Sequence, residues 1–186
     1  MRQSSYNDEK ALILKAVDGD KHAFGKLYDL YSGKIYQYCL YRLGSQMDAG
    51  DMTGTVFLKA WESLPSFGKR NGDMHFRAWL YRIAHNLIVD SYRQRDQEPE
   101  KESFFQELDN PLPVETVLEK NEMRDRLLHA VQKLDGPYQQ VIYFRFIEEM
   151  SHRDTAQITG LTEANVRVIQ YRALKKMREI FGDTHE

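Results

Sequence analysis

Residues 166–177 combine cations and an aromatic side chain at a spacing that could bind nucleic acid. If the stretch is helical, one face carries Arg167, Val168, Tyr171, Arg172 and Lys175. Guanidinium and ammonium groups hold phosphates, and Arg also pairs with base edges in the major groove. The other face carries Val166, Ile169, Ala173 and Met177 at the three- and four-residue steps of a buried helix face. The stretch therefore predicts an amphipathic helix with a cationic outer face.

A shorter helix must precede this one to hold it in place. Ser151 is a suitable N-cap for a helix over His152–Thr159, and Gly160 suits a residue that leaves helical dihedral angles. Thr162 can cap the second helix. The carboxylate of Glu163, just inside that helix, complements the positive N-terminal end of the helix dipole. This order of a short helix, a glycine-containing turn and a longer basic helix is the helix-turn-helix pattern. In that pattern the second helix enters the major groove of DNA. On this stretch alone, a helical hairpin with a solvated charged face explains the pattern equally well.

No set of residues suggests an enzyme or a metal site. The sequence contains no nucleophile–base pair, no phosphate-cradling glycine loop and no His or Cys at metal-ligand spacing. We expect His75 and His85 to be surface residues. Cys39 is the only cysteine, which excludes an internal disulfide and fits a reducing cytoplasm, and it is predicted to be a small buried apolar residue. We therefore expect no catalytic residue, no cofactor and no bound metal.

The distribution of charge is more informative than its total, which is −2. Residues 67–95 hold six Lys or Arg against two Asp, and residues 162–178 hold five against one Glu. Residues 96–119 hold eight Asp or Glu against one Lys. Two basic segments therefore flank an acidic one, and the near-neutral total hides two stretches suited to a polyanion.

Helical periodicity extends over the first half of the chain. We predict helices over Asp8–Val17, from the cap Asp20 to Gly44, over Asp48–Ser63 with Pro65 as terminator, and over Met74–Arg95. The third helix has Ala49, Met52, Val56, Ala60 and Leu64 inward. The fourth is expected to bury Phe76, Leu80, Ile83 and Leu87 and to expose Arg77, Tyr81, Arg82, Asn86 and Arg93. Between them, Gly68–Asp73 is predicted to be a charged loop.

The stretch that follows loses this periodicity. From Gln94 to Pro113 it is acidic and contains three prolines, which favours a flexible linker. Helix returns over Val114–Leu134 and, after a break at Asp135–Pro137, over Tyr138–Glu149. No run keeps strand periodicity for long. The predicted fold class is therefore all-α, with two small helical domains (residues 1–95 and 114–186) joined by an acidic flexible linker (residues 96–113), the second domain ending in the helix-turn-helix.

Taken together, these segments resemble those of bacterial RNA polymerase sigma factors of the extracytoplasmic-function group of the sigma-70 family. The resemblance is carried by AFGKLYDLY (23–31), DAGDMTGTVFLKAW (48–61), FRAWLYRIAHNLIVDSYR (76–93) and the closing helix-turn-helix. It covers nearly the whole chain. The family has two helical domains joined by a flexible linker, and its members bind core RNA polymerase and direct it to promoters.

The resemblance implies two roles for the first domain. In the family, the segment matching residues 48–64 docks on the clamp helices of the polymerase, so the candidate polymerase-binding residues are Asp48, Asp51, Phe57, Leu58, Lys59 and Glu62. Ordinary solvation explains Lys59 and Glu62 equally well. The segment matching residues 68–95 opens the minus-ten promoter element, so the candidate DNA-binding residues are Asn71, Arg77, Tyr81, Arg82, Asn86 and Arg93. We expect Trp79 to lie in the hydrophobic core and not at the DNA-binding surface.

For the second domain, the resemblance implies that the helix-turn-helix reads the minus-thirty-five element as duplex DNA. The candidates are Asn165, Arg167, Val168, Tyr171, Arg172 and Lys175. The family's linker passes through the polymerase channel used by nascent RNA, where an acidic segment could mimic a polyanion. A solvated tether explains the acidic residues equally well.

The sequence departs from the family at two places. Gly50, Gly54 and Thr55 stand where the family has a long polar residue, Gln and an acidic residue. Each glycine inside a helix costs about 1 kcal/mol relative to Ala, and the effect on polymerase docking is left open. Gln170 stands where the family prefers an inward aliphatic residue, and we expect Ile169 to take over that packing.

We therefore predict a non-enzymatic transcription-initiation factor whose partners are core RNA polymerase and promoter DNA, as upstream duplex and as melted minus-ten strand, with an anti-sigma factor as a further candidate partner. One alternative is a sigma-like mimic that sequesters an anti-sigma factor, which the two basic faces disfavour. Another is a stand-alone helix-turn-helix regulator, which leaves the first domain unexplained. The chain shows no signal peptide and no run near the ~20 apolar residues of a membrane span. We predict a cytoplasmic protein.

Overall fold

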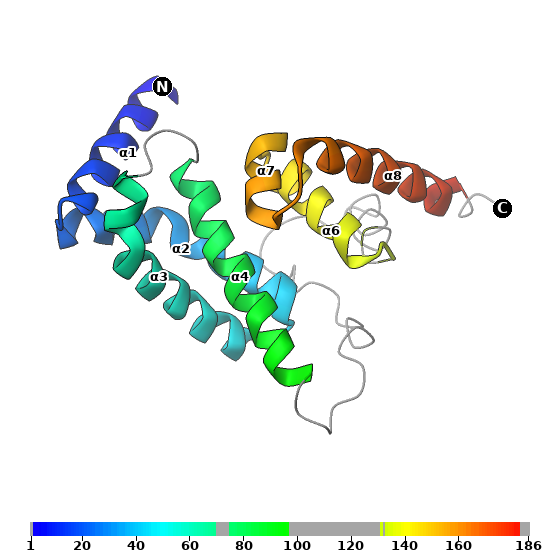
Figure 1. Cartoon of the computed structure of the whole chain (residues 1–186), viewed down its shortest axis with the longest axis horizontal. Coiled ribbons are helices and arrows are strands. Elements are labelled where there is room, and N and C mark those ends of the chain that lie inside the picture. Colours follow the sequence, from blue (N-terminus) through cyan, green and yellow to red (C-terminus); the bar gives the residue numbers. More distant parts are fainter. Residues whose placement is uncertain (1, 70–74, 97–130, 132, 183–186) are drawn as a thin grey trace, which may run out of the picture. The chain divides into compact units, whose positions relative to one another are not determined.

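The computed structural model describes residues 2–69, 75–96, 131 and 133–182, and every regular element among them is a helix (Figure 1). The predicted all-α class is confirmed. The chain divides into two compact units, Met1–Phe104 and Phe105–Glu186. Most of the predicted acidic linker and of the predicted helix over residues 114–134 lies outside the described residues. The domain boundaries therefore stay predictions.

The first unit is built around one central helix. Helix α2 (Lys21–Leu43) packs against α1 (Arg2–Val17), α3 (Gln46–Lys69) and α4 (Phe76–Asp96), and α3 in turn packs against α1 and α4 (Figure 1). Each fully buried aliphatic or aromatic side chain contributes roughly 1.5–3 kcal/mol to stability. The largest of these side chains in the unit are Leu27, Ile35 and Tyr38 of α2, Val56 and Leu64 of α3, and Leu80, Tyr81 and Ile88 of α4.

The ends of α2 agree with the sequence prediction. The Asp20 carboxylate accepts hydrogen bonds from the backbone N–H groups of His22 (2.8 Å) and Ala23 (3.1 Å), which satisfies two unpaired donors of the first turn. Gly44 ends the helix with φ 69°, a left-handed conformation that glycine adopts without steric cost. Helix α1 also ends at Val17 as predicted, although it begins at Arg2 and not at Asp8.

Pro65 does not end α3, and this prediction is wrong. The helix begins at Gln46, passes through Pro65 and ends at Lys69. A proline inside a helix removes one backbone hydrogen bond and costs about 3 kcal/mol. The turn beyond it gains tertiary contacts in return, because the Phe67 ring packs against Phe76 (5.6 Å between centroids) and Trp79 (4.7 Å). Aromatic pairs of this kind add about 0.5–1.5 kcal/mol each beyond area burial.

The buried face of α4 is wider than the sequence predicted. Phe76 and Leu80 are buried as expected, but Ile83 and Leu87 are only partly buried. Tyr81 and His85 are buried in addition. The reason is that α4 packs against two helices, α2 and α3, whereas periodicity predicts a single inward stripe.

The second unit contains α6 (Gly136–Ile142), η1 (Tyr143–Ile147), α7 (His152–Thr159) and α8 (Glu163–Gly182). The helix predicted over 138–149 starts earlier, because Pro137 lies in its first turn, where a missing N–H costs nothing. It widens into the π-helical turn η1 and ends at Ile147. Glu149 follows with φ 49°, so the backbone reverses before α7 begins.

Candidate nucleic-acid interface

The caps of the helix-turn-helix lie where the sequence placed them. The Ser151 hydroxyl accepts a hydrogen bond from the Asp154 N–H (3.0 Å) and donates one to the Asp154 carboxylate (2.7 Å). Gly160 ends α7 with φ 73°, and the Thr162 hydroxyl accepts a bond from the Asn165 N–H (3.2 Å). Local capping chemistry thus fixes both ends of the turn.

The inner face of α8 anchors the recognition helix. Val166 and Ala173 are fully buried and Met177 is nearly so. Val166 packs with Val141 of α6 and Ala156 of α7, with Ile169 partly buried beside them. Farther along, Ala173 and Met177 pack with Val131, Leu134 and Ile142. The predicted inward stripe is therefore present, and it leaves the opposite face of α8 outside the unit's core.

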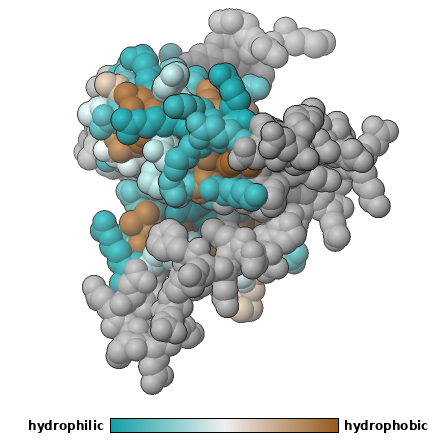
Figure 2. Space-filling model, turned by 90° about the vertical axis from the view of Figure 1, so that its right-hand side faces the viewer, coloured by the Kyte–Doolittle hydropathy of each residue, from teal (hydrophilic) through white to brown (hydrophobic). Residues whose placement is uncertain are grey.

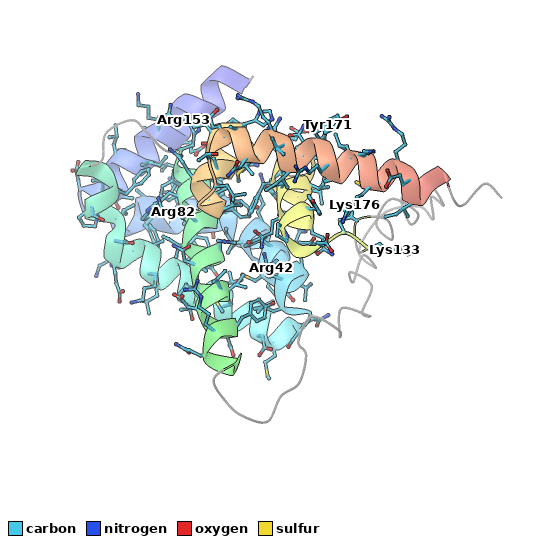
Figure 3. The ribbon with its side chains drawn as sticks, turned by 45° about the vertical axis from the view of Figure 1, so that its right-hand side comes forward. Arg42, Arg82, Lys133, Arg153, Tyr171 and Lys176 are labelled. Carbon is cyan, nitrogen blue, oxygen red and sulfur yellow. The ribbon has the colours of Figure 1, made fainter. Side chains whose placement is uncertain are left out.

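The outer face of α8 presents all six predicted side chains to solvent. Tyr171 is 71% exposed and projects from a different side of the helix than Lys176 does (Figure 3). The Lys176 ammonium group donates a hydrogen bond to the Asp135 carboxylate. Arg167 pairs with Glu163 at 3.4 Å and Lys175 with Glu179 at 4.0 Å. Exposed pairs of this kind are worth at most about 1 kcal/mol, so phosphates can readily replace the carboxylates. The exposed set is Asn165, Arg167, Val168, Tyr171, Arg172 and Lys175.

The coloured part of the surface in Figure 2 is mainly hydrophilic, with separate hydrophobic patches. None of the helices in the described part of the chain has the length and hydropathy that crossing a bilayer requires. Within those same residues, no three His, Cys, Asp or Glu side chains gather closely enough to hold a metal ion.

The predicted minus-ten residues divide into two groups. Arg82, Asn86 and Arg93 are exposed on α4 (Arg82 is labelled in Figure 3), and their spacings of four and seven residues put them on one helix face. Arg77 is partly buried. Asn71 lies outside the described residues. The exposed position predicted for Tyr81 is wrong: its side chain is fully buried, edge-on to Tyr38 at 5.4 Å, so it cannot stack on a base in this conformation.

His85 is also not a surface residue, contrary to the sequence prediction. It is 8% exposed, and its Nδ1 forms a hydrogen bond with the Tyr38 hydroxyl (3.2 Å). Burial, with a smaller contribution from the Arg42 charge, lowers the pKa of His85 to about 4. His85 is therefore neutral near pH 7 and belongs to the core that holds α4 on α2. His75 is exposed, as expected.

Most of the predicted polymerase-binding residues on α3 reach the surface. Asp51, Leu58, Lys59 and Glu62 are exposed and Asp48 is partly buried. Phe57 is the exception: it is 4% exposed and packs against Tyr28 (4.7 Å between centroids) and Phe24 (6.3 Å). Its assignment to a docking surface is therefore wrong, because its ring fills the core. It adjoins Val56 and Ala60, which the sequence predicted to be inward, and Thr53, which the structure also buries.

The same exposed face of α3 contains a smooth strip. Gly50 and Gly54 are exposed, and a Cβ at either position would meet no neighbouring atom within 4 Å. Met47, which no sequence pattern indicated as functional, lies three residues before Gly50 and is 75% exposed. Met47, Gly50, Gly54 and Leu58 thus follow each other at three- and four-residue steps along one face.

Comparison with known proteins gives consistent matches. Residues 27–98 match the family model of sigma-70 region 2, and residues 124–177 match that of sigma-70 region 4. The ECF RNA polymerase sigma factor BldN of Streptomyces coelicolor is 33% identical over 175 residues, covering 92% of this chain and 65% of BldN. This chain therefore spans about two thirds of that relative's length. The ECF RNA polymerase sigma-E factor of Haemophilus influenzae is 30% identical, covering 89% of this chain and 90% of the relative. A solved structure of CnrH in complex with the cytosolic domain of CnrY is similar with a TM-score of 0.65 at 25% identity, covering 95% of this chain and 98% of that one.

Proposed function

Because this chain belongs to the extracytoplasmic-function family of RNA polymerase sigma factors, we infer that its two units divide promoter recognition between them as the two family regions do. The protein is a transcription-initiation factor and not an enzyme: it binds core RNA polymerase and directs it to promoter DNA. Since its polymerase and promoters are cytoplasmic, we propose that it acts in the cytoplasm.

The observation that carries this proposal is the outer face of α8. Four cationic or aromatic side chains, Arg167, Tyr171, Arg172 and Lys175, are exposed there, while the buried stripe fixes the orientation of the helix. A recognition helix needs this combination, since it must enter the major groove without losing its own support. We assign the minus-thirty-five element to this face, where a well-made bidentate base contact is worth about 1–3 kcal/mol.

We assign the minus-ten element to α4. Arg82, Asn86 and Arg93 form a polar face suited to the DNA backbone, and the Arg93–Asp90 pair beside it is loose at 3.9 Å. With Tyr81 buried, Trp79 replaces it as the candidate for stacking on an unpaired base. Trp79 is partly buried and precedes Arg82 by three residues, so the two side chains are neighbours on the helix surface.

We assign polymerase docking to the exposed face of α3, with Asp48, Asp51, Leu58, Lys59 and Glu62 around the glycine strip. Long polar side chains would keep a partner helix at a distance, whereas two glycines on one face permit close approach. The cost of the two glycines, roughly 2 kcal/mol of helix stability, is then offset by contact with the polymerase. The open space around Gly50 and Gly54 supports this assignment.

The decisive experiment is reconstitution of transcription. Purified full-length protein, core RNA polymerase and a genomic DNA library are combined, and the run-off transcripts are sequenced. We expect start sites absent with core polymerase alone, preceded by two shared sequence elements at a constant spacing. Transcripts identical to those of core polymerase alone would instead support the sigma-like mimic. Sequence-specific DNA binding without any polymerase requirement would support the stand-alone regulator.

An anti-sigma partner for this chain stays a prediction. The CnrH structure contains the cytosolic domain of a second protein, CnrY, which shows that a protein of similar fold is held by a protein partner. Adding a candidate partner to the reconstituted reaction tests the prediction, because an anti-sigma factor should abolish the new start sites and leave core transcription intact.

A further inference from the structure

The outermost line of the recognition helix α8 begins with apolar side chains. Ala164, Val168, Tyr171 and Lys175 follow each other at four- and three-residue steps, directly opposite the buried stripe that anchors the helix. Val168 is 46% exposed and Tyr171 is 71% exposed, and Ala164 is exposed as well. We call Ala164 and Val168 the apolar crest, because neither side chain has a polar atom and both point away from the unit's core.

The stability of the second unit does not explain the apolar crest. A valine in a helix has a lower helix propensity than the polar residues Lys, Glu or Gln, because its branched Cβ restricts the side chain. An exposed valine also gains little of the free energy that burial supplies. One exposed apolar residue is ordinary on a protein surface. Two of them in line with the exposed ring of Tyr171 form an apolar surface that a binding partner would cover.

The charges beside the apolar crest identify that partner as DNA. At about 100° of rotation per residue, the exposed Arg167 lies on one side of the crest and the exposed Arg172 on the other. Glu163 pairs with Arg167 at 3.4 Å, so the carboxylate of the first turn lies on that flank and not on the crest. An apolar line with a guanidinium group on each side matches the major groove, whose base edges lie between two phosphate backbones.

The chemistry of the major groove restricts what the apolar crest can recognise there. The C5 methyl of thymine is the apolar group by which base pairs differ in this groove, and the other distinguishing groups are hydrogen-bond donors and acceptors. Alanine and valine side chains cannot pair with those polar groups, and covering an unpaired polar group costs free energy. Contact with a methyl group instead removes apolar surface from water. The crest also lies in the first two turns of α8 (Glu163–Gly182), the part of a recognition helix that contacts base edges.

We propose that Ala164 and Val168 read thymine methyl groups, so that this sigma factor selects thymines at two nearby base pairs of its minus-thirty-five element. The proposal rests on the proposed function and adds the chemistry by which α8 chooses its sequence. Four residues of helix span about 6 Å and successive base pairs are about 3.4 Å apart, so the two thymines lie within two base-pair steps of each other. Tyr171 is not assigned to a methyl group, because its hydroxyl can pair with any base edge or with a phosphate.

Replacing thymine with uracil tests the methyl group alone, because uracil lacks the C5 methyl and keeps the hydrogen-bonding groups of thymine. Full-length protein assembled with core polymerase is bound to a fluorescent duplex of a promoter found by run-off sequencing. Each thymine of the minus-thirty-five element is replaced in turn by uracil. We expect two of these replacements, at most two base pairs apart, to weaken binding about fourfold each, which is the effect of one buried methyl-sized group. Uracil at the other thymines should have no comparable effect.

Protein variants assign each methyl group to one side chain by double-mutant cycles. Val168→Ala should lose the sensitivity to uracil at one of the two positions and keep it at the other. Ala164→Gly should show the reverse pattern. Leu174→Ala is the matched control, because Leu174 is an apolar residue of α8 that is 40% exposed and lies off the crest. It should retain both uracil effects. Thermal melting and affinity for core polymerase are measured for each variant.

The outcomes distinguish this proposal from the function it rests on. A wild-type protein that directs no promoter binding removes the proposed function itself. If the wild type binds but its minus-thirty-five element has no thymine, or tolerates uracil at every thymine, methyl reading is refuted and the sigma-factor function stands. Uracil effects of equal size in the wild type, Val168→Ala and Ala164→Gly would assign the methyl contacts to other residues and refute the proposal. A loss confined to polymerase affinity would place the apolar crest in a protein interface and also overturn it.

Discussion

The buried His85 should make the first unit sensitive to acid. Its pKa is lowered from the ordinary value of 6.5 to about 4 in the folded protein. Between these values the unfolded chain binds more protons than the folded one, so stability is fully present above pH 6.5 and is lost as the pH falls toward 4. At about 1.4 kcal/mol per pKa unit, the loss attributable to His85 is about 3 kcal/mol. That is a large share of the roughly 5–15 kcal/mol that stabilises a typical domain.

Tryptophan fluorescence can measure this loss in the full-length protein. The sequence contains two tryptophans, and both, Trp61 and Trp79, lie in the first unit. Urea unfolding followed by their emission at pH 7 and pH 4.5 therefore reports that unit alone. Other groups titrate over this range too, so the relevant quantity is the difference in pH dependence between the wild type and His85→Gln, which keeps a polar partner for Tyr38 and cannot titrate.

We expect the wild type to lose about 2–3 kcal/mol more than His85→Gln between the two pH values. At pH 7 the variant should be the less stable of the two, because the bond between Tyr38 and Nδ1 is optimised for imidazole. Equal pH dependence of the two proteins, within about 0.5 kcal/mol, would refute the reasoning, since a solvent-exposed histidine with an ordinary pKa behaves in that way.

Three further predictions concern single side chains. Arg172→Ala should leave urea unfolding unchanged, since Arg172 is exposed, yet cost about 1–3 kcal/mol of promoter binding; unchanged binding would remove Arg172 from the site. Gly54→Gln should stabilise the isolated protein by up to about 1 kcal/mol, because the new Cβ meets open space, and it should weaken binding to core polymerase. A higher affinity of the variant for core polymerase would contradict the close approach of the polymerase to α3. Gly68→Ala should destabilise the first unit by about 1–3 kcal/mol, because its Cβ would overlap the Val17 side chain; adding Val17→Ala should recover most of that loss, and failure to do so would show that the cause is not this contact.

The sequence alone determined those features that depend on neighbours along the chain. Asp20, Ser151 and Thr162 cap helices because a short side-chain oxygen reaches the N–H groups two or three residues ahead, whatever the rest of the fold does. Gly44 and Gly160 end helices because only glycine adopts positive φ without steric cost. The outer face of α8 could be predicted for a similar reason: one stripe packs on one side, so the 3.6-residue period assigns the remainder to solvent.

Tertiary structure decided the features that depend on contacts between distant segments. Tyr81 and His85 are buried because α4 packs against two helices, and Tyr38, whose side chain meets both, lies more than forty residues away in the chain. Pro65 lies inside α3 because Phe67 packs against Phe76 and Trp79. The hydrogen bond from Arg145 Nε of η1 to Gln170 Oε1 of α8 forms only when these two elements meet, since the two residues are twenty-five positions apart in the chain. Local propensities carry no information about such pairings, because the free energy that decides them comes from burial and contacts created when the helices assemble.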